Sequence, residues 1–359
     1  MVSRAIILQL QAEFLRVPIS VIVVNFNRRE LLRACLGSLA LQNSVRFEVI
    51  VVDNGSSDGS VAMVESCFAQ HTRFSLQLIK NTENRGFCGA NNQGIRCAGG
   101  ELIALLNNDA EAAPDWLAEL ANALLAREDI GMAASKILVY EDHRRIDKAG
   151  HLIYFDGQNR GRGAGQMDYG QFDSLEEVLW PDGCAAMYRK SMLDRIGGFD
   201  EDLFAYGDDA ELGLRARIAG WGCLYVPGAV VRHHRGATLG VLSSRRLELI
   251  ERNRVLLAVK HFPPGLLWLN PFYFLLRLGA GAWAAARGKG EVGKFPGLAG
   301  KARAAWAVFR GNIEALTMIP RTIQKRRGIR HLRKLSNRQI RQLLSQYRIS
   351  LKELMEQAI

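Results

Sequence analysis

Over the first 130 residues, short apolar runs alternate with segments of helical periodicity, and this alternation constrains the fold more than any other feature. The apolar runs predict strands over 18–26, 47–52, 76–79 and 102–106. The periodic segments predict helices over 29–41, 59–69, 87–98 and 114–126. Strands and helices at this spacing form right-handed βαβ units. The sequence therefore predicts an α/β chain with a mostly parallel central sheet and helices on both faces.

Polar clusters follow three of the predicted strands at their carboxyl ends, where parallel sheets bind ligands. Asn25 and Asn27 follow the first strand, Asp53 ends the second, and Asn107-Asn108-Asp109 ends the fourth. The Asp53 carboxylate either accepts a hydrogen bond from a nucleobase N–H or shapes an Asx turn. Asp109 either holds a divalent cation together with a diphosphate or ends its strand in a turn. Their coincidence at one edge of the sheet favours a ligand site.

A further group of acids opens the predicted helix over 208–219, in the segment Tyr206-Gly207-Asp208-Asp209-Ala210-Glu211. The helix macrodipole favours acids at this end, which explains one acid better than three. Repulsion between Asp208 and Asp209 raises at least one pKa and suits a general base, whereas the dipole lowers it, and the sequence leaves that balance open. Predicted strands near 223–226 and 230–234 lead to His233 and His234, which are either structural or an extra metal ligand.

Residues 131–180 are rich in glycine and charge and show no regular periodicity. They predict an irregular, mobile loop beside the substrate. Residues 161–166 superficially resemble a dinucleotide-binding loop, but no apolar strand precedes them and no helical pattern follows. Order is predicted to return at Trp180–Arg189.

Charge divides the chain into two regions of opposite sign. Residues 241–359 carry 23 basic and 6 acidic side chains, whereas residues 1–240 carry 24 and 30. We therefore predict an N-terminal extension over 1–17, a folded domain over 18–240 and a basic helical region over 241–359. Within that region, residues 265–286 are aromatic and apolar with basic flanks, which favours a helix lying in a membrane interface. The alternatives are a buried helix pair or a true membrane span.

The cysteines and the N-terminus bear on the compartment. The six cysteines are scattered, with no C-x-x-C pair and no zinc spacing, as in reduced proteins. Gln9, Gln11 and Glu13 interrupt the only apolar stretch before residue 18, so no secretory signal is predicted. Together these features predict a cytoplasmic protein.

Four blocks in one order carry a resemblance to a known family: VIVVNFNRRELLRACLGSLALQ, VIVVDNGSSDGS, NRGFCGANNQGI leading to ALLNNDA, and GGFDEDLFAYGDDAELGLRARIAGW. The line VPGAVVRHHRGAT closes the set. Over Ile19–Thr238 the chain resembles the family 2 glycosyltransferases of the GT-A fold. Within that family it is most similar to bacterial rhamnosyltransferase-like and galactofuranosyltransferase-like members. The resemblance implies the nucleotide-diphospho-sugar transferase fold.

The resemblance also implies residue roles. Asp209 is implied as the catalytic base, with Asp208 beside it where many relatives have glutamate. Asp109 is implied as the last residue of a D-x-D metal motif, in which Asn107 replaces the first aspartate, and His233 as a further metal ligand ahead of His234. The implied donor-binding residues are Asn25, Asn27, Asp53, Asn84, Arg85, Gly86, Asn91, Asn92 and Asn108. The implied sugar and acceptor pocket comprises Trp180, Asp182 and Gly183.

The implied activity is the transfer of one sugar from a nucleoside-diphosphate donor in a single inverting step, with Mg or Mn as cofactor. Rhamnose is the first guess for the sugar. The acceptor is a hydroxyl of a glycan or lipid-linked molecule in cell-envelope polysaccharide synthesis. The basic region predicts an anionic membrane surface as partner, at the inner face of the plasma membrane, and no nucleic acid. Three rival hypotheses remain: a basic nucleic-acid-binding protein, a sugar nucleotidylyltransferase, and a non-catalytic relative.

Overall fold

The computed structural model describes residues 18–43, 45–235 and 243–356. Its first half is a set of parallel strands in the order β3-β2-β1-β4, which confirms the predicted βαβ pattern. The strands are β1 (Ile19–Asn25), β2 (Phe47–Asp53), β3 (Ser75–Lys80) and β4 (Leu102–Leu106). The helices between and after them are α2 (Arg29–Ala40), α3 (Ser60–Cys67), α4 (Gly86–Cys97) and α5 (Trp116–Leu125).

The sheet continues beyond β4 with strands from the second half of the chain. Strand β11 (Ala185–Arg189) lies antiparallel between β4 and β6 (Ile130–Val139). Strand β12 (Gly222–His233) runs parallel to β6, and its register shifts between Val226 and Val230. Two separate strands were predicted here, and a bulge joins them into one. Short strands β5 (Ala110–Ala112) and β10 (Glu176–Glu177) pair with β12. Because β6 and β12 run in the same direction as β1–β4, the sheet is mostly parallel.

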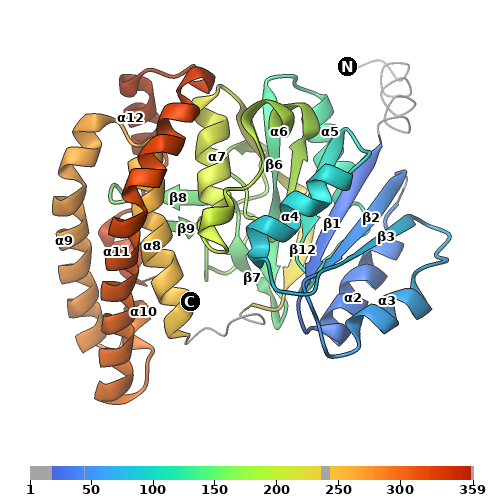
Figure 1. The fold of residues 1–359 in the computed structure, drawn as a ribbon, viewed down its shortest axis with the longest axis horizontal. Helices are drawn as coiled ribbons and strands as arrows, with labels where there is room; N and C mark the ends of the chain where they lie inside the picture. The colour runs from blue at the N-terminus through green and yellow to red at the C-terminus, as the bar shows by residue number, and fades with distance from the viewer. Residues whose placement is uncertain (1–17, 44, 236–242, 357–359) are drawn as a thin grey trace.

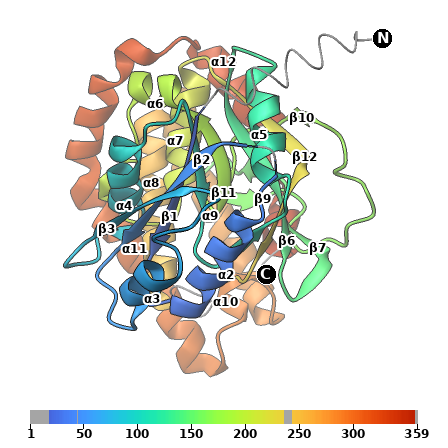
Figure 2. The ribbon, with the colours of Figure 1, turned by 90° about the vertical axis from the view of Figure 1, so that its right-hand side faces the viewer.

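Apolar side chains cover both faces of this sheet. Alternate residues of β1 and β2 point to opposite sides, so Val21 and Val49 pack toward α2, α3 and α5. Ile22 and Ile50 pack toward α4, α6 (Lys190–Ile196) and α7 (Asp208–Ile218). Figure 2 shows α4 on one side of the sheet and α2 and α5 on the other. The prediction of helices on both faces is confirmed.

The segment 131–180 is more regular than predicted. It contains β6, β7 (Asp142–Lys148), β8 (His151–Ile153) and β9 (Asn159–Gly161), with β7 antiparallel to β6 and β8 paired with β9. The prediction of an irregular loop was wrong: charge masks β7, strands β8 and β9 are only three residues long, and the mainly apolar run of β6 was overlooked. β7 reads DHRRIDK, and the buried strand β6 contains Lys136, which is ion-paired with Asp168 and Asp173.

Helices build the described C-terminal part, at the end of the molecule opposite β3 (Figure 1). They are α8 (Ser244–His261), α9 (Pro264–Ala286), α10 (Gly290–Gly293), α11 (Gly297–Gly328), α12 (Asn337–Gln346) and α13 (Leu351–Glu356). Helix α8 packs against α7 and α11 and so joins this part to the sheet domain. None of the helices in the described residues is both long and apolar enough to cross a membrane. The predicted extension over 1–17 and the predicted boundary at 240/241 lie outside the described residues.

Candidate active site

The ends of β1 and β2 carry a buried hydrogen-bond network. Asn25 lies opposite Asp53 in the parallel register, and its Nδ2 donates to Asp53 Oδ2 at 3.0 Å. Asn108 Nδ2 donates to Asn25 Oδ1 at 2.7 Å, which connects the turn after β4 to the same network. The backbone N–H of Ser56 donates to Asp53 Oδ1 at 2.9 Å. Asp53 thus shapes its own turn, and its buried carboxylate stays at the carboxyl edge of the sheet, where parallel sheets bind ligands.

The neighbouring loops are tied to this network by asparagine side chains. Asn27 Oδ1 accepts the N–H of Ser57 at 2.8 Å. Asn54 Nδ2 donates to Asn84 Oδ1 at 3.1 Å, and Asn54 Oδ1 accepts the N–H of Arg85. Sequence reasoning assigned no role to Asn54, although its place directly after Asp53 in a strand-end turn was a usable signal.

Gly86, at the start of α4, lets two loops approach each other. Its φ is +71°, and a Cβ there would lie 2.5 Å from the Phe204 ring and 2.6 Å from the Phe204 carbonyl oxygen. Any larger residue would push the 203–207 loop away from α4. The segment 84–86, which was predicted to bind the donor, and the loop before α7 therefore depend on each other for position.

Asn91, Asn92 and Trp180 serve packing in this structure. Asn91 Nδ2 donates to the Phe87 carbonyl oxygen within α4. Asn92 exchanges two hydrogen bonds with the backbone of Phe199, at 2.9 and 2.8 Å. Trp180 is fully buried, and a Cβ on Gly213 of α7 would lie only 2.2 Å from its Cβ. These three residues hold α4, the 198–201 segment and α7 in place around the site.

Asp109 and His233 form a close pair because β5 pairs with the end of β12, with His233 opposite Ala110. His233 Nε2 lies 3.4 Å from Asp109 Oδ1, a buried atom with no hydrogen-bond partner among the described residues. On the far side of the ring, His233 Nδ1 lies 2.8 Å from Asp147 Oδ2. A carboxylate on Nδ1 orients a histidine so that Nε2 can bind a metal.

The pair fits a divalent cation. The separation of 3.4 Å is long for a hydrogen bond, and two ligands at about 2.1 Å from one ion lie roughly 3 Å apart in octahedral geometry. Burial by itself lowers the pKa of His233, but Cys184, Asp109 and Asp147 raise it well above its usual range. The surroundings therefore favour positive charge at this point. His234 instead stacks on Tyr140 at 3.5 Å, so it is His233 that lies beside Asp109.

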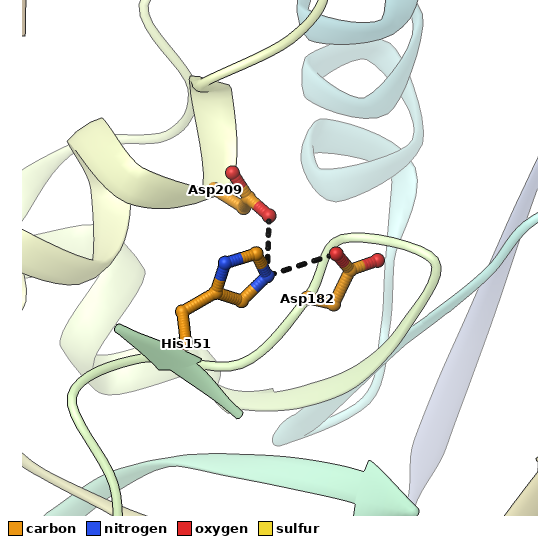
Figure 3. A group of neighbouring side chains, drawn as sticks. All are labelled: His151, Asp182 and Asp209. Carbon is orange, nitrogen blue, oxygen red and sulfur yellow. Dashed lines mark hydrogen bonds and ion pairs between the residues drawn. The ribbon is translucent and has the colours of Figure 1, made fainter. Parts of the chain in front are cut away.

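A second cluster gathers around the first turn of α7 (Figure 3). His151 Nε2 lies 2.9 Å from Asp182 Oδ2 and 3.4 Å from Asp209 Oδ2. Lys148 Nζ lies 2.5 Å from the same Asp182 oxygen. The side chains of His151, Asp182 and Asp209 are of types that bind metals. However, Asp182 Oδ2, the oxygen that His151 contacts, is already ion-paired with the Lys148 ammonium. A cation here would have to displace a buried ion pair, so the Asp109–His233 pair is the better candidate for a metal site.

Burial and repulsion between carboxylates decide the balance that the sequence left open. The pKa of Asp209 is raised, mainly by burial and also by Asp182, although His151 and Lys148 act in the opposite direction. The pKa of Asp208 is raised well above its usual range by burial and by Asp209. Of the two, Asp209 faces His151, whereas Asp208 lies near Gly183, on which a Cβ would be 3.7 Å from Asp208 Oδ2. A raised pKa suits a carboxylate that accepts a proton near neutral pH.

The end of β7 and the start of β8 supply residues that sequence reasoning missed. Asp147 reaches His233, Lys148 reaches Asp182, and His151 lies between Asp182 and Asp209. The short segment 147–151 therefore connects the candidate metal pair to the candidate base. The run Asp147-Lys148-x-x-His151 was a visible cluster of titratable groups, but it was assigned to an irregular loop.

Helix α8 supplies another missed residue, Asn253. Its Nδ2 lies 2.9 Å from the Leu203 oxygen, 2.9 Å from the Ala205 oxygen and 2.6 Å from the Tyr206 oxygen. The side chain is buried and holds the loop that leads directly into Asp208. The C-terminal helices are therefore part of the support of the site.

Comparison with solved structures defines the class of fold. The mannosyltransferase PcManGT of Pyrobaculum calidifontis, solved with GDP-Man and Mn²⁺, superposes with a TM-score of 0.52 at 20% identity. The match covers 83% of this chain and 86% of that chain. The fold is the GT-A fold of nucleotide-sugar transferases.

The family follows from sequence comparison. Residues 20–197 match the family described as Glycosyl transferase family 2. The O-antigen biosynthesis protein RfbC of Myxococcus xanthus is 28% identical over 70% of this chain. The N-acetylglucosaminyl-diphospho-decaprenol L-rhamnosyltransferase of Mycobacterium tuberculosis is 27% identical over 61% of this chain and 77% of its own length. The chain belongs to the family 2 glycosyltransferases.

The lengths of these relatives differ from that of the chain. The match spans only 19% of the Myxococcus protein, and 25% of an uncharacterized protein of Sinorhizobium fredii that is 28% identical to this chain.

Proposed function

We propose that the protein transfers a sugar, with rhamnose as the first candidate, from a nucleoside-diphosphate donor to a hydroxyl group, with inversion at the anomeric carbon. The observation that carries this proposal is the short segment 147–151, from the end of β7 to the start of β8, which joins a metal-type Asp109–His233 pair to a buried carboxylate, Asp209, with a raised pKa. The name of the Mycobacterium relative supports rhamnose as the sugar and a lipid-linked acceptor. The name of the Myxococcus relative supports a role in cell-envelope polysaccharide synthesis.

The donor would lie across the carboxyl edge of the sheet. In this proposal the Asp53 carboxylate reads the base, and Asn25 and Asn108 hold that carboxylate in place. Asp109 and His233 would hold Mg²⁺ or Mn²⁺, which neutralises charge on the diphosphate. The predicted donor-binding roles of Asn91 and Asn92 reduce to positioning, since their amides are engaged in packing.

Asp209 is proposed to remove the proton from the acceptor hydroxyl while that oxygen attacks the sugar. The proton moves to the carboxylate of Asp209, and the bond between the anomeric carbon and the departing phosphate oxygen breaks. The Lys148 ammonium lies near Asp182, and His151 and Lys148 both act to lower the pKa of Asp209, which limits how far burial can raise the pKa of the base. Asp182 fixes His151 and Lys148 through one oxygen.

We also propose that the protein acts at the inner face of the plasma membrane on a glycan or lipid-linked acceptor, and that it has no nucleic-acid partner. The free state of all six cysteines fits a reducing compartment. The basic C-terminal helices fit an anionic lipid surface.

Donor calorimetry tests the function directly. UDP-, dTDP- and GDP-sugars would be titrated with and without Mn²⁺, and we expect metal-dependent binding of one donor. NMR of the product then reports the anomeric configuration, which inverts if the proposal holds. Asp209→Asn should keep donor affinity and lose transfer. Turnover of a nucleoside triphosphate and a sugar phosphate to a nucleotide sugar would point to a nucleotidylyltransferase instead. An Asp209→Asn variant that loses donor affinity and rate equally would contradict the assignment of the base.

A further inference from the structure

Helix α9 turns an apolar face to solvent. The side chains of Trp268 and Trp283, near its two ends, are 86% and 62% exposed. Large exposed apolar residues lie between them: Leu269, Phe272, Leu275, Leu276 and Leu278. A surface helix ordinarily buries such residues and exposes its charges.

The only charged residue of α9 points the other way. Arg277 is turned toward the protein, where its guanidinium lies 2.5 Å from Asp156 Oδ2 and 2.7 Å from Glu251 Oε2. Both carboxylates are buried, so the arginine satisfies them and is itself largely covered. The outward face of α9 therefore carries no charge at all. Its polarity is the inverse of an ordinary amphipathic helix.

Helix α11 adds a second apolar row at helical spacing. Its exposed apolar residues are Leu298, Trp306, Phe309, Ile313, Leu316 and Ile323. Arginines lie beside this row, among them Arg303 and Arg310, and both are exposed. The start of α11 is joined to the end of α9 by Lys301, whose Nζ donates to the Ala285 carbonyl oxygen at 3.0 Å. The two helices lie at the same end of the molecule (Figure 1).

The exposed charges of this region have one sign. Between Phe262 and Arg330 the chain has 12 basic residues and 2 acidic ones. Both acids are ion-paired with arginines of other elements: Glu291 with Arg160 and Arg246, and Glu314 with Arg245 and Arg252. No acidic side chain is exposed in this stretch. An anionic partner therefore meets positive charge around an apolar centre.

We propose that the outward faces of α9 and α11 form a docking surface for an anionic lipid bilayer. Helix α9 has tryptophan near both ends and basic residues around it. This composition suits the membrane interface, where indole rings lie among the lipid headgroups and basic side chains contact anionic ones. A second copy of the chain would bring the same positive charge to the contact. A nucleic acid would leave the uncharged face of α9 unused. This inference rests on the proposed function. If the acceptor is lipid-linked, a surface that binds the bilayer would bring the enzyme to its acceptor.

Vesicle sedimentation tests the surface without any turnover. The full chain would be mixed with vesicles of phosphatidylcholine alone or with phosphatidylglycerol. We expect binding that needs phosphatidylglycerol and weakens with salt. The double variant Phe272→Asp/Leu275→Asp should lower the partition coefficient at least tenfold, and Arg303→Gln/Arg310→Gln should lower it mainly at low salt. Leu175→Asp, an exposed leucine on the loop before β10, is the matched control and should bind as the wild type does.

The outcomes separate the surface from the enzyme. Circular dichroism and thermal unfolding of each variant report whether the fold is intact, and donor calorimetry is measured separately. Unchanged vesicle binding by the folded Phe272→Asp/Leu275→Asp variant would overturn the proposal, as would equal binding to neutral vesicles. Dimerisation that the same variant abolishes, or retention of RNA in place of vesicles, would assign the surface to another occupant and also overturn it. Vesicle binding by a protein that binds no donor would leave the surface standing and remove the proposed function.

Discussion

Asn253→Ala should remove the hydrogen bonds by which helix α8 holds the 203–207 loop, directly before Asp208, in place. The Asn253 amide is surrounded by three carbonyl oxygens, those of Leu203, Ala205 and Tyr206, in the loop that precedes Asp208. The variant leaves the Ala205 and Tyr206 oxygens without this donor, whereas the Leu203 oxygen keeps the Arg252 guanidinium at 2.9 Å. Each net hydrogen bond contributes about 1 kcal/mol, so the loss amounts to about 2 kcal/mol.

The loop also stores strain that Asn253 holds in place. Phe204 and Tyr206 have φ of 64° and 67°, in the left-handed region, where a non-glycine residue costs about 1–3 kcal/mol. Without the amide, the loop can relax to lower-energy dihedral angles and carry the first turn of α7 with it. We expect transfer to fall at least 100-fold, because a misplacement of the base by about 1 Å is enough for that. Donor affinity should fall much less than transfer, because the loop touches the donor side only at the start of α4, whereas the network around Asp53 lies on other elements.

The assay compares transfer rate, donor affinity by calorimetry and thermal unfolding. Asn270→Ala is the matched control, since this asparagine also bonds to a carbonyl oxygen, that of Phe155 at 3.4 Å, but lies on α9 away from the loop. A transfer rate within twofold of the wild type in a folded Asn253→Ala protein would refute the reasoning. Equal losses of donor affinity and rate would show a global defect in place of a displaced base.

Further predictions concern the base, the metal pair and a buried acid. Asp209→Asn should lower transfer about 10²–10⁴-fold, as measured by product formation at saturating donor. Because the base must be ionised, transfer should fall as pH drops through the raised pKa of Asp209. His151→Gln removes an interaction that lowers this pKa, so the acid limb of the pH–rate profile should move to higher pH. His233→Ala should weaken donor binding in the presence of Mn²⁺ much more than in its absence, by calorimetry. Glu251 has a pKa lowered to about 2, since Arg277 and Arg254 outweigh burial, against 4.5 unfolded; its stabilisation, roughly 3 kcal/mol at most, is present above pH 4.5 and is lost as pH falls toward 2. Urea unfolding of Glu251→Gln should therefore differ from the wild type more at pH 6 than at pH 3.

The hydrophobic pattern of the sequence was sufficient to predict the strands of the first half of the sheet. The runs that became β1, β2 and β4 are apolar and β-branched, and a fully buried parallel strand needs little else. The strand ends then placed Asn25, Asp53 and Asp109 at one edge, because all parallel strands end on the same side. The same patterns failed for β7, whose edge position tolerates charges and hides the alternation.

The sequence by itself therefore determined the fold class and the strand-end acids, since both follow from short-range periodicity. The tertiary structure alone decided which side chains meet: Asp147 with His233 across 86 positions, and His151 at the start of β8 with Asp209 in the first turn of α7. It also decided that Arg277 turns inward and leaves α9 apolar outside. The physical reason is that periodicity reports which face of an element is buried. The partner that neutralises a buried charge is set by how distant elements pack.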